Sequence, residues 1–149
     1  MKRLLERGGV ISGSSAGAQV QSSFMTRGDY TRRLILGDKR HQKGFGFVSN
    51  SAFDVHVEER DREQDLFQVF RAKPSQLQDR YLDAKKLLGI GIDQNTAIIV
   101  VKNQFRVSGR GNVYLFDPHK WEESSGEISY QILHNGAIFD MVERRVVKE

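Results

Sequence analysis

The chain has no cysteine, and this absence excludes two classes of site. Without a thiol among its 149 residues, the protein can form neither a disulfide nor a thiolate metal site. It also has no apolar run long enough to span a membrane as a helix, so we expect no membrane partner. The N-terminal segment Met1–Arg7 is too short and too charged for a secretory signal. This favours a cytoplasmic over a secreted protein, and any signal would lie upstream of Met1.

Strong positive charge and clustered aromatic side chains are missing as well. The formal net charge is +4, and a mildly basic balance does not by itself predict nucleic-acid binding. No basic segment carries the interleaved aromatic residues on which single strands stack. The basic run at 39–43 is typical of a solvated loop. We therefore expect no nucleic-acid partner.

The composition present is that of one globular domain. Hydrophobic residues make up 38% and charged residues 28% of the chain, and its length suits one core. We expect a single domain over 1–149, with an α/β pattern in the first two thirds and a β meander in the last third. Expected strands lie at 10–12, 44–48, 52–57, 89–93, 96–101, 104–107, 112–116, 129–133 and within 136–147. Expected helices lie at 16–24, 58–72 and 77–88.

The most informative segment is Gly8–Ala18, where an apolar run meets the pattern Gly-x-Ser-x-Gly. This pattern is typical of a nucleophile elbow, a tight strand-to-helix turn that exposes a serine at the start of the helix. In this interpretation Ser15 is the nucleophile, and the Ala16 N–H stabilises an oxyanion. Gly13 and Gly17 allow the backbone to turn sharply. The alternative is a Gly/Ser turn that only caps a helix, since a motif alone is a hypothesis.

A serine nucleophile needs a base, and the base needs a group that orients it. His56 ends an expected strand beside a charged cluster, at the sheet edge where α/β sites form. Asp54 shares a face with it if the segment is extended, and the polar residues 93–96 follow another expected strand. A strand histidine can also be purely structural, and 93–96 can be a simple polar turn. The other histidines lie in expected loops or turns: His41, His119 and His134.

Together these segments resemble the cyanophycinase-like serine peptidases, the family that also contains peptidase E. Beside the elbow, the histidine segment Gly44–His56 and the third segment Gly89–Ala97 resemble family blocks in the same order. The resemblance implies Ser15 as nucleophile and His56 as base, with no metal or organic cofactor. It also implies the fold: a class I glutamine amidotransferase-like (flavodoxin-like) α/β sheet with helices on both faces.

The resemblance further implies substrate contacts and a substrate class. Asp54, Arg60 and Arg62 lie where family members contact substrate, and guanidinium groups pair well with carboxylates. The best-known family substrate is cyanophycin, an aspartate polymer with arginine side branches that is cleaved to β-aspartyl-arginine. The expected activity is hydrolysis of a peptide or isopeptide bond in such an Asp-rich substrate.

The chain departs from the family pattern in four places, one of which is an apparent insertion around residues 78–86. The glutamate that completes the family triad is here Gln94; its carbonyl can accept the imidazole N–H but cannot offset the imidazolium charge. Neutralising the acid of a serine triad costs on the order of 10⁴ in turnover, and Asp54 is a candidate for a substitute acid. Val55 replaces a polar family residue. The family's N-terminal strands are missing, so the chain resembles the C-terminal portion of such an enzyme.

These departures leave a second function open. A catalytically impaired fragment or pseudoenzyme would bind peptides or serve as a partner subunit. Its partner would be a second copy of the chain or the missing N-terminal half. On its own, an apolar elbow strand would have an unpaired edge.

Overall fold

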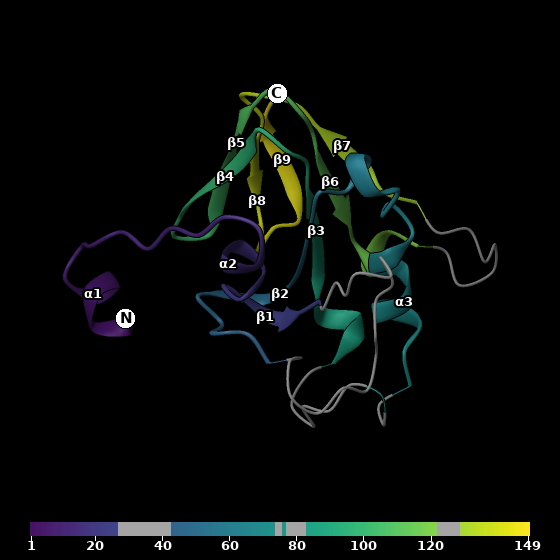
Figure 1. Cartoon of the computed structure of the whole chain (residues 1–149), viewed down its shortest axis with the longest axis horizontal. Helices are drawn as coiled ribbons and strands as arrows, with labels where there is room; N and C mark the ends of the chain where they lie inside the picture. Colours follow the sequence, from purple (N-terminus) through teal and green to yellow (C-terminus); the bar gives the residue numbers. More distant parts are fainter. Residues whose placement is uncertain (27–42, 74–75, 77–82, 122–128) are drawn as a thin grey trace.

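The computed structural model describes residues 1–26, 43–73, 76, 83–121 and 129–149, which form two β-sheets and three short α-helices (Figure 1). The helices are α1 (Lys2–Glu6), α2 (Ala16–Gln19) and α3 (Asp65–Arg71). The larger sheet contains β1 (Ser22–Met25), β2 (Val48–Val55), β3 (Leu88–Ile92), β6 (Val113–Phe116) and β7 (Gln131–Leu133). The smaller sheet contains β4 (Thr96–Val101), β5 (Gln104–Gly109), β8 (Ile138–Asp140) and β9 (Arg145–Lys148). Three short 3₁₀ turns are η1 (Glu58–Arg60), η2 (Ala84–Lys86) and η3 (Pro118–Lys120).

The larger sheet has the strand order β1-β2-β3-β6-β7. Its first three strands run parallel, and β6 and β7 run antiparallel to their neighbours. The smaller sheet, β4-β5-β8-β9, is antiparallel throughout. Because parallel strands end at the same edge of a sheet, the residues that follow β2 and β3 lie close together.

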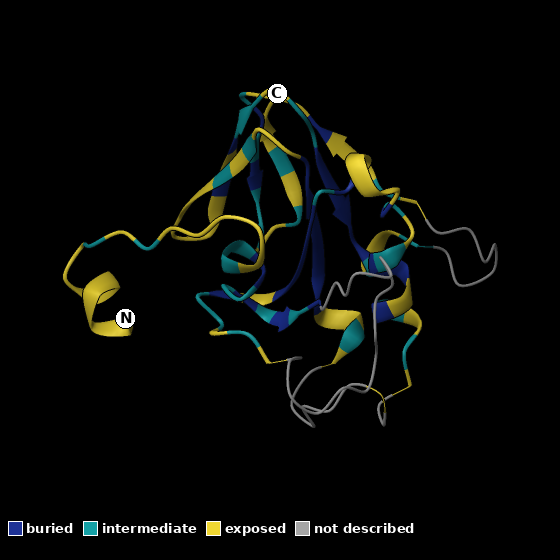
Figure 2. Ribbon diagram, in the orientation of Figure 1, coloured by how far each residue is buried: buried dark blue, intermediate teal, exposed yellow. Residues whose placement is uncertain are grey.

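The larger sheet buries apolar side chains on both faces. On one face Phe53 and Ile90 pack in a cluster with Phe105 and Phe139 of the smaller sheet. On the other face α3 packs against the sheet, and a second cluster joins its apolar residues to β1 and β6. Burial is continuous along β3 and β6, which lie between these two layers (Figure 2). The core therefore has a sheet on one side and a helix on the other.

The expected flavodoxin-like α/β fold with helices on both faces is wrong. The smaller antiparallel sheet, rather than a layer of helices, covers one face of the larger sheet. Buried and exposed residues alternate at the start of β5, so this strand has an apolar face that must pack against another layer. Among the described helices, α1 buries no residue and α2 buries only Gln19.

The N-terminal elements also differ from expectation. Residues 10–12 form no strand, and Val10 is 85% exposed; α1 stands apart from the sheets at the end of this segment (Figure 1). The expected helix at 16–24 ends at Gln19, and β1 follows it. The Ser22 Oγ donates to the Gln19 carbonyl oxygen at 2.7 Å and to the Phe24 carbonyl oxygen at 2.6 Å. Such side-chain hydrogen bonds compete with helix continuation.

Two further expected helices are altered. The helix expected at 58–72 is divided into η1 and α3, because Asp61 adopts a left-handed conformation with φ 50° between them. Half of the helix expected at 77–88, residues 77–82, lies outside the described residues. The other half is not an α-helix, because it contains the 3₁₀ turn η2 and the first residue of β3. His41 and most of the basic run at 39–43 also lie outside them. No helix in the described ranges is both long and apolar enough to cross a membrane.

Candidate active site

The Gly-x-Ser-x-Gly segment forms a strained turn at the start of α2. Ser15 is the N-cap residue, with φ 52° and ψ −124°, a conformation that costs a residue with a side chain on the order of 1–3 kcal/mol. A Cβ atom on Gly13 would lie 2.1 Å from the Gly17 carbonyl oxygen, so only glycine allows this close approach. Gly17 needs no such freedom, because a Cβ atom there would meet no atom within 4 Å. No strand precedes the turn among the described residues, but a strained, exposed serine at the start of a helix is typical of a nucleophile turn.

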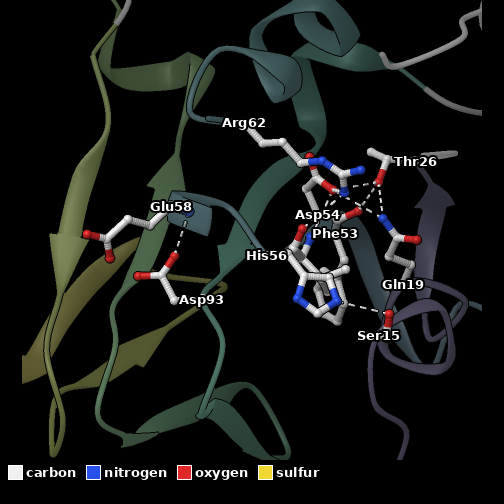
Figure 3. Close-up of polar contacts among 10 residues, drawn as sticks. Ser15, Gln19, Thr26, Phe53, Asp54, His56, Glu58, Arg62 and Asp93 are labelled. Carbon is white, nitrogen blue, oxygen red and sulfur yellow. Dashed lines mark hydrogen bonds and ion pairs between the residues drawn. The ribbon is translucent and has the colours of Figure 1, made fainter. Parts of the chain in front are cut away.

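His56 lies against this serine. The Ser15 Oγ is 3.1 Å from the His56 Nε2 (Figure 3), which is within the distance needed for proton transfer. His56 follows β2 directly, and its backbone N–H donates to the Ile92 carbonyl oxygen of β3 at 2.8 Å. The ends of two parallel strands therefore hold the imidazole, and α2 brings the hydroxyl to it. The contact expected between Ser15 and His56 is present.

The surroundings of His56 favour the neutral imidazole. Burial lowers the pKa of His56 below its usual value of 6.5, and the positive charge of Arg60 lowers it further. The negative charge of Glu59 opposes this shift, and Arg62 adds a smaller lowering. A neutral imidazole can accept a proton at neutral pH, as a general base must.

We expect covalent modification of Ser15 to depend on pH through His56. A fluorophosphonate, which reacts with activated serines, should label the protein faster as pH rises, because the neutral fraction of the imidazole increases. The midpoint should lie below 6.5, since the pKa of His56 is lowered. The labelling rate measured between about pH 5 and 8 checks this, and a midpoint above 6.5 would contradict it.

A buried hydrogen-bond network joins the helix of Ser15 to the strand of His56 (Figure 3). Asp54 is 2% exposed, and its Oδ1 accepts from the Gln19 Nε2 at 3.1 Å, the Val55 N–H at 2.8 Å and the Arg62 Nη1 at 3.3 Å. The Gln19 Nε2 also donates to the Thr26 Oγ1 at 2.8 Å. Because Gln19 belongs to α2 and Asp54 to β2, this network fixes the elbow relative to the histidine.

The network changes the interpretation of Asp54 and Arg62. Their side chains are each 3% exposed and form an ion pair, so they bind one another and are not accessible to a substrate, contrary to expectation. Burial raises the pKa of Asp54 to about 6, against the lowering effect of Arg62. Arg60, by contrast, is exposed and is the one of these three residues that a substrate could reach.

Gln94 does not orient His56 in this structure. The His56 Nδ1 is buried and has no hydrogen-bond partner within the described part of the chain. Gln94 is exposed in the turn after β3, and its backbone N–H donates to the Glu59 Oε1 at 3.1 Å. The expected interaction fails because the turn fixes the backbone of Gln94 without directing its amide to the ring.

The remaining candidates have separate positions. The Ala16 N–H lies beside Ser15 and donates to none of the described backbone carbonyls, so it is available to an oxyanion. Asp93 accepts the Glu58 N–H and the Asn112 N–H at 3.0 Å each. Because both carboxylate oxygens of Asp93 already accept backbone N–H groups, Asp93 is unsuited to orient the imidazole.

No family model matches the chain.

Sequence reasoning missed three residues of this site: Gln19, Thr26 and Glu59. Gln19 lies four residues after Ser15, one turn along a helix, and that spacing places both side chains on one helix face. Glu59 belongs to the charged cluster after His56, but nothing in its spacing showed that it would reach Gln94. No sequence signal identified Thr26.

Proposed function

We propose that this chain is a serine-type hydrolase in which Ser15 is the nucleophile and His56 is the general base. The observation that carries the proposal is the 3.1 Å contact between the Ser15 Oγ on its strained turn and the His56 Nε2. A serine activated by an adjacent imidazole is suited to acyl transfer. The resemblance to cyanophycinase-like peptidases supports a peptide or isopeptide bond as the target.

In the proposed mechanism the Ser15 Oγ attacks the scissile carbonyl carbon while the His56 Nε2 takes the hydroxyl proton. The negative charge that develops on the carbonyl oxygen is stabilised by the Ala16 N–H. His56 then returns the proton to the leaving amine as the C–N bond breaks. Water attacks the acyl-enzyme in the same way, and the carboxylic acid leaves.

The proposed substrate is an Asp-rich isopeptide such as cyanophycin. Arg60 is exposed, and its charge acts on His56, so it can bind a substrate carboxylate near the reacting carbonyl. The other two residues expected to contact substrate, Asp54 and Arg62, are buried together and do not support this assignment.

Cyanophycin hydrolysis tests the proposal directly. The wild-type protein should release β-aspartyl-arginine, and Ser15→Ala should reduce the rate by about 10³-fold or more, because the acyl-enzyme cannot form. Ser14→Ala is the matched control, since Ser14 precedes the nucleophile on the same exposed turn. It should keep most of the activity. Equal hydrolysis by wild type and Ser15→Ala would contradict the assignment.

One observation favours a second function, a peptide-binding protein without turnover. The His56 Nδ1 has no acceptor among the described residues, and a triad without its third member is much weakened. Such a protein would bind β-aspartyl-arginine oligomers without cleaving them. Saturable binding measured by calorimetry, together with intact oligomers after long incubation, would favour this alternative.

A further inference from the structure

We propose that Glu59 is the positioning residue that orients His56 during catalysis. The resemblance gives this role to a glutamate, and Gln94 occupies the position of that glutamate in this chain. This inference rests on the proposed function, because Glu59 acts through the general base. It makes the chain a Ser15–His56–Glu59 hydrolase rather than an impaired enzyme.

The site needs an acceptor for the imidazole. If the His56 Nε2 is to take a proton from Ser15, the neutral ring must carry its own proton on Nδ1. That nitrogen is buried and has no partner among the described residues. Figure 3 shows that it lies on the side of the ring away from Ser15. A buried N–H without an acceptor costs roughly 1–3 kcal/mol, so an acceptor at this position would stabilise the catalytic tautomer.

Glu59 contacts the turn that follows β3, close enough to His56 for its charge to act on the imidazole. Its two carboxylate oxygens are 3.1 and 3.4 Å from the Gln94 backbone nitrogen. His56 is joined by its own backbone N–H to Ile92, two residues before Gln94. The carboxylate therefore lies beside the segment that would carry the triad acid. Its charge already acts on His56, where it raises the pKa against the effect of burial.

Other carboxylates near His56 are engaged or directed elsewhere. Asp54 binds Gln19, Val55 and Arg62 through its Oδ1. Asp93 uses each of its oxygens for a different backbone N–H. The Glu58 carboxylate points away from His56 in Figure 3.

Glu59 can change partner without disturbing the core. It is exposed, and it lies in η1, three residues after His56. Rotation of its side chain from the Gln94 N–H to the His56 Nδ1–H replaces an exposed hydrogen bond with one that strengthens as the imidazolium forms. The carboxylate then offsets the positive charge that Gln94 cannot offset.

The test combines ring ¹⁵N NMR of His56 with hydrolysis kinetics in the full chain. In Glu59→Gln the pKa of His56 should fall further, and the Nδ1–H tautomer should lose population. The kcat should fall by about 10²–10⁴-fold with KM nearly unchanged. Glu58→Gln, the neighbouring exposed carboxylate, should match the wild type.

Each outcome separates this inference from the proposed function. If Glu59→Gln leaves the His56 pKa, the tautomer and the rate unchanged, the positioning role is overturned. If the wild type hydrolyses nothing while Glu59→Gln still shifts the His56 pKa and tautomer, the hydrolase proposal fails and the interaction between Glu59 and His56 stands.

Discussion

Replacing Asp54 by alanine should lower the free energy of unfolding by about 3–5 kcal/mol, the cost of removing one partner of a buried ion pair. The Asp54 Oδ1 accepts from Gln19, Val55 and Arg62, so its loss leaves three donors short of an acceptor. The Arg62 Nε and Nη2 are already buried without a described partner. Urea denaturation followed by circular dichroism measures the change.

Two matched variants identify the cause. Asp54→Asn keeps an acceptor oxygen in place and should cost much less than Asp54→Ala. Asp54→Ala combined with Arg62→Met removes the unpaired charge as well, and should recover a large part of the loss. If alanine and asparagine destabilise the protein equally, the network does not stabilise it in the way described.

The same variants give a pH test with a definite sign. The pKa of Asp54 is about 6 in the folded protein, against an ordinary value of 3.8 for an aspartate that is not buried. The native state therefore binds the proton more tightly than the unfolded state. Stability from this group therefore rises as pH falls through 6 toward 4. The wild type should gain stability relative to Asp54→Asn over that range. Nearby Asp65 remains in both proteins, so its own titration largely cancels.

The second large effect concerns the base. Fluorophosphonate labelling of Ser15 should slow by about 10²–10⁴-fold in His56→Ala, which is the usual contribution of a general base. The 3.1 Å contact between the Ser15 Oγ and the His56 Nε2 is the physical reason, since alanine cannot take the hydroxyl proton. The rate of adduct formation, followed by intact mass, measures this.

His119→Ala is the control for that experiment. His119 is an exposed histidine in η3, a separate element from the elbow and β2, and its variant should label at the wild-type rate. An equal slowing in both variants would show that histidine loss acts through folding or general reactivity rather than through the Ser15 contact.

The positions of Ser15 and His56 were predictable from the sequence because each follows a local rule, and the family resemblance implied that the two residues meet. A Gly-x-Ser-x-Gly turn exposes its serine, and a histidine that follows a strand lies at the sheet edge. Both rules hold in the structure: Ser15 caps α2, and His56 follows β2. The strands of the last third were predictable for a similar reason, since alternation such as that in β5 is visible in the sequence.

The layering was not predictable from those patterns. Alternation shows that β5 has an apolar face, but it does not show which layer covers that face. Phe105 and Phe139 of the smaller sheet cover one face of the larger sheet. A layer of helices would have buried that face equally well, so the sequence pattern does not distinguish the two arrangements. The apolar residue Val10 suggested a buried strand, yet it is 85% exposed, because strand burial depends on a neighbour that sequence periodicity does not reveal.

The polar part of the site depended on long-range contacts. Arg60 and Arg62 look alike in the sequence, and only the fold shows that Arg62 is buried against Asp54 while Arg60 stays exposed. Gln94 follows its strand as expected, but its contact with Glu59 is made by its backbone N–H and not by its amide side chain. Contacts between residues 35 positions apart, such as this one, leave no local pattern.

The central claim is that Ser15 is an activated nucleophile, and the most direct measurement is the position of a fluorophosphonate adduct on the folded wild-type chain. Digestion and tandem mass spectrometry should locate the adduct on Ser15, with none on the adjacent Ser14. A folded protein that forms no adduct, or forms it on another serine, would contradict the claim.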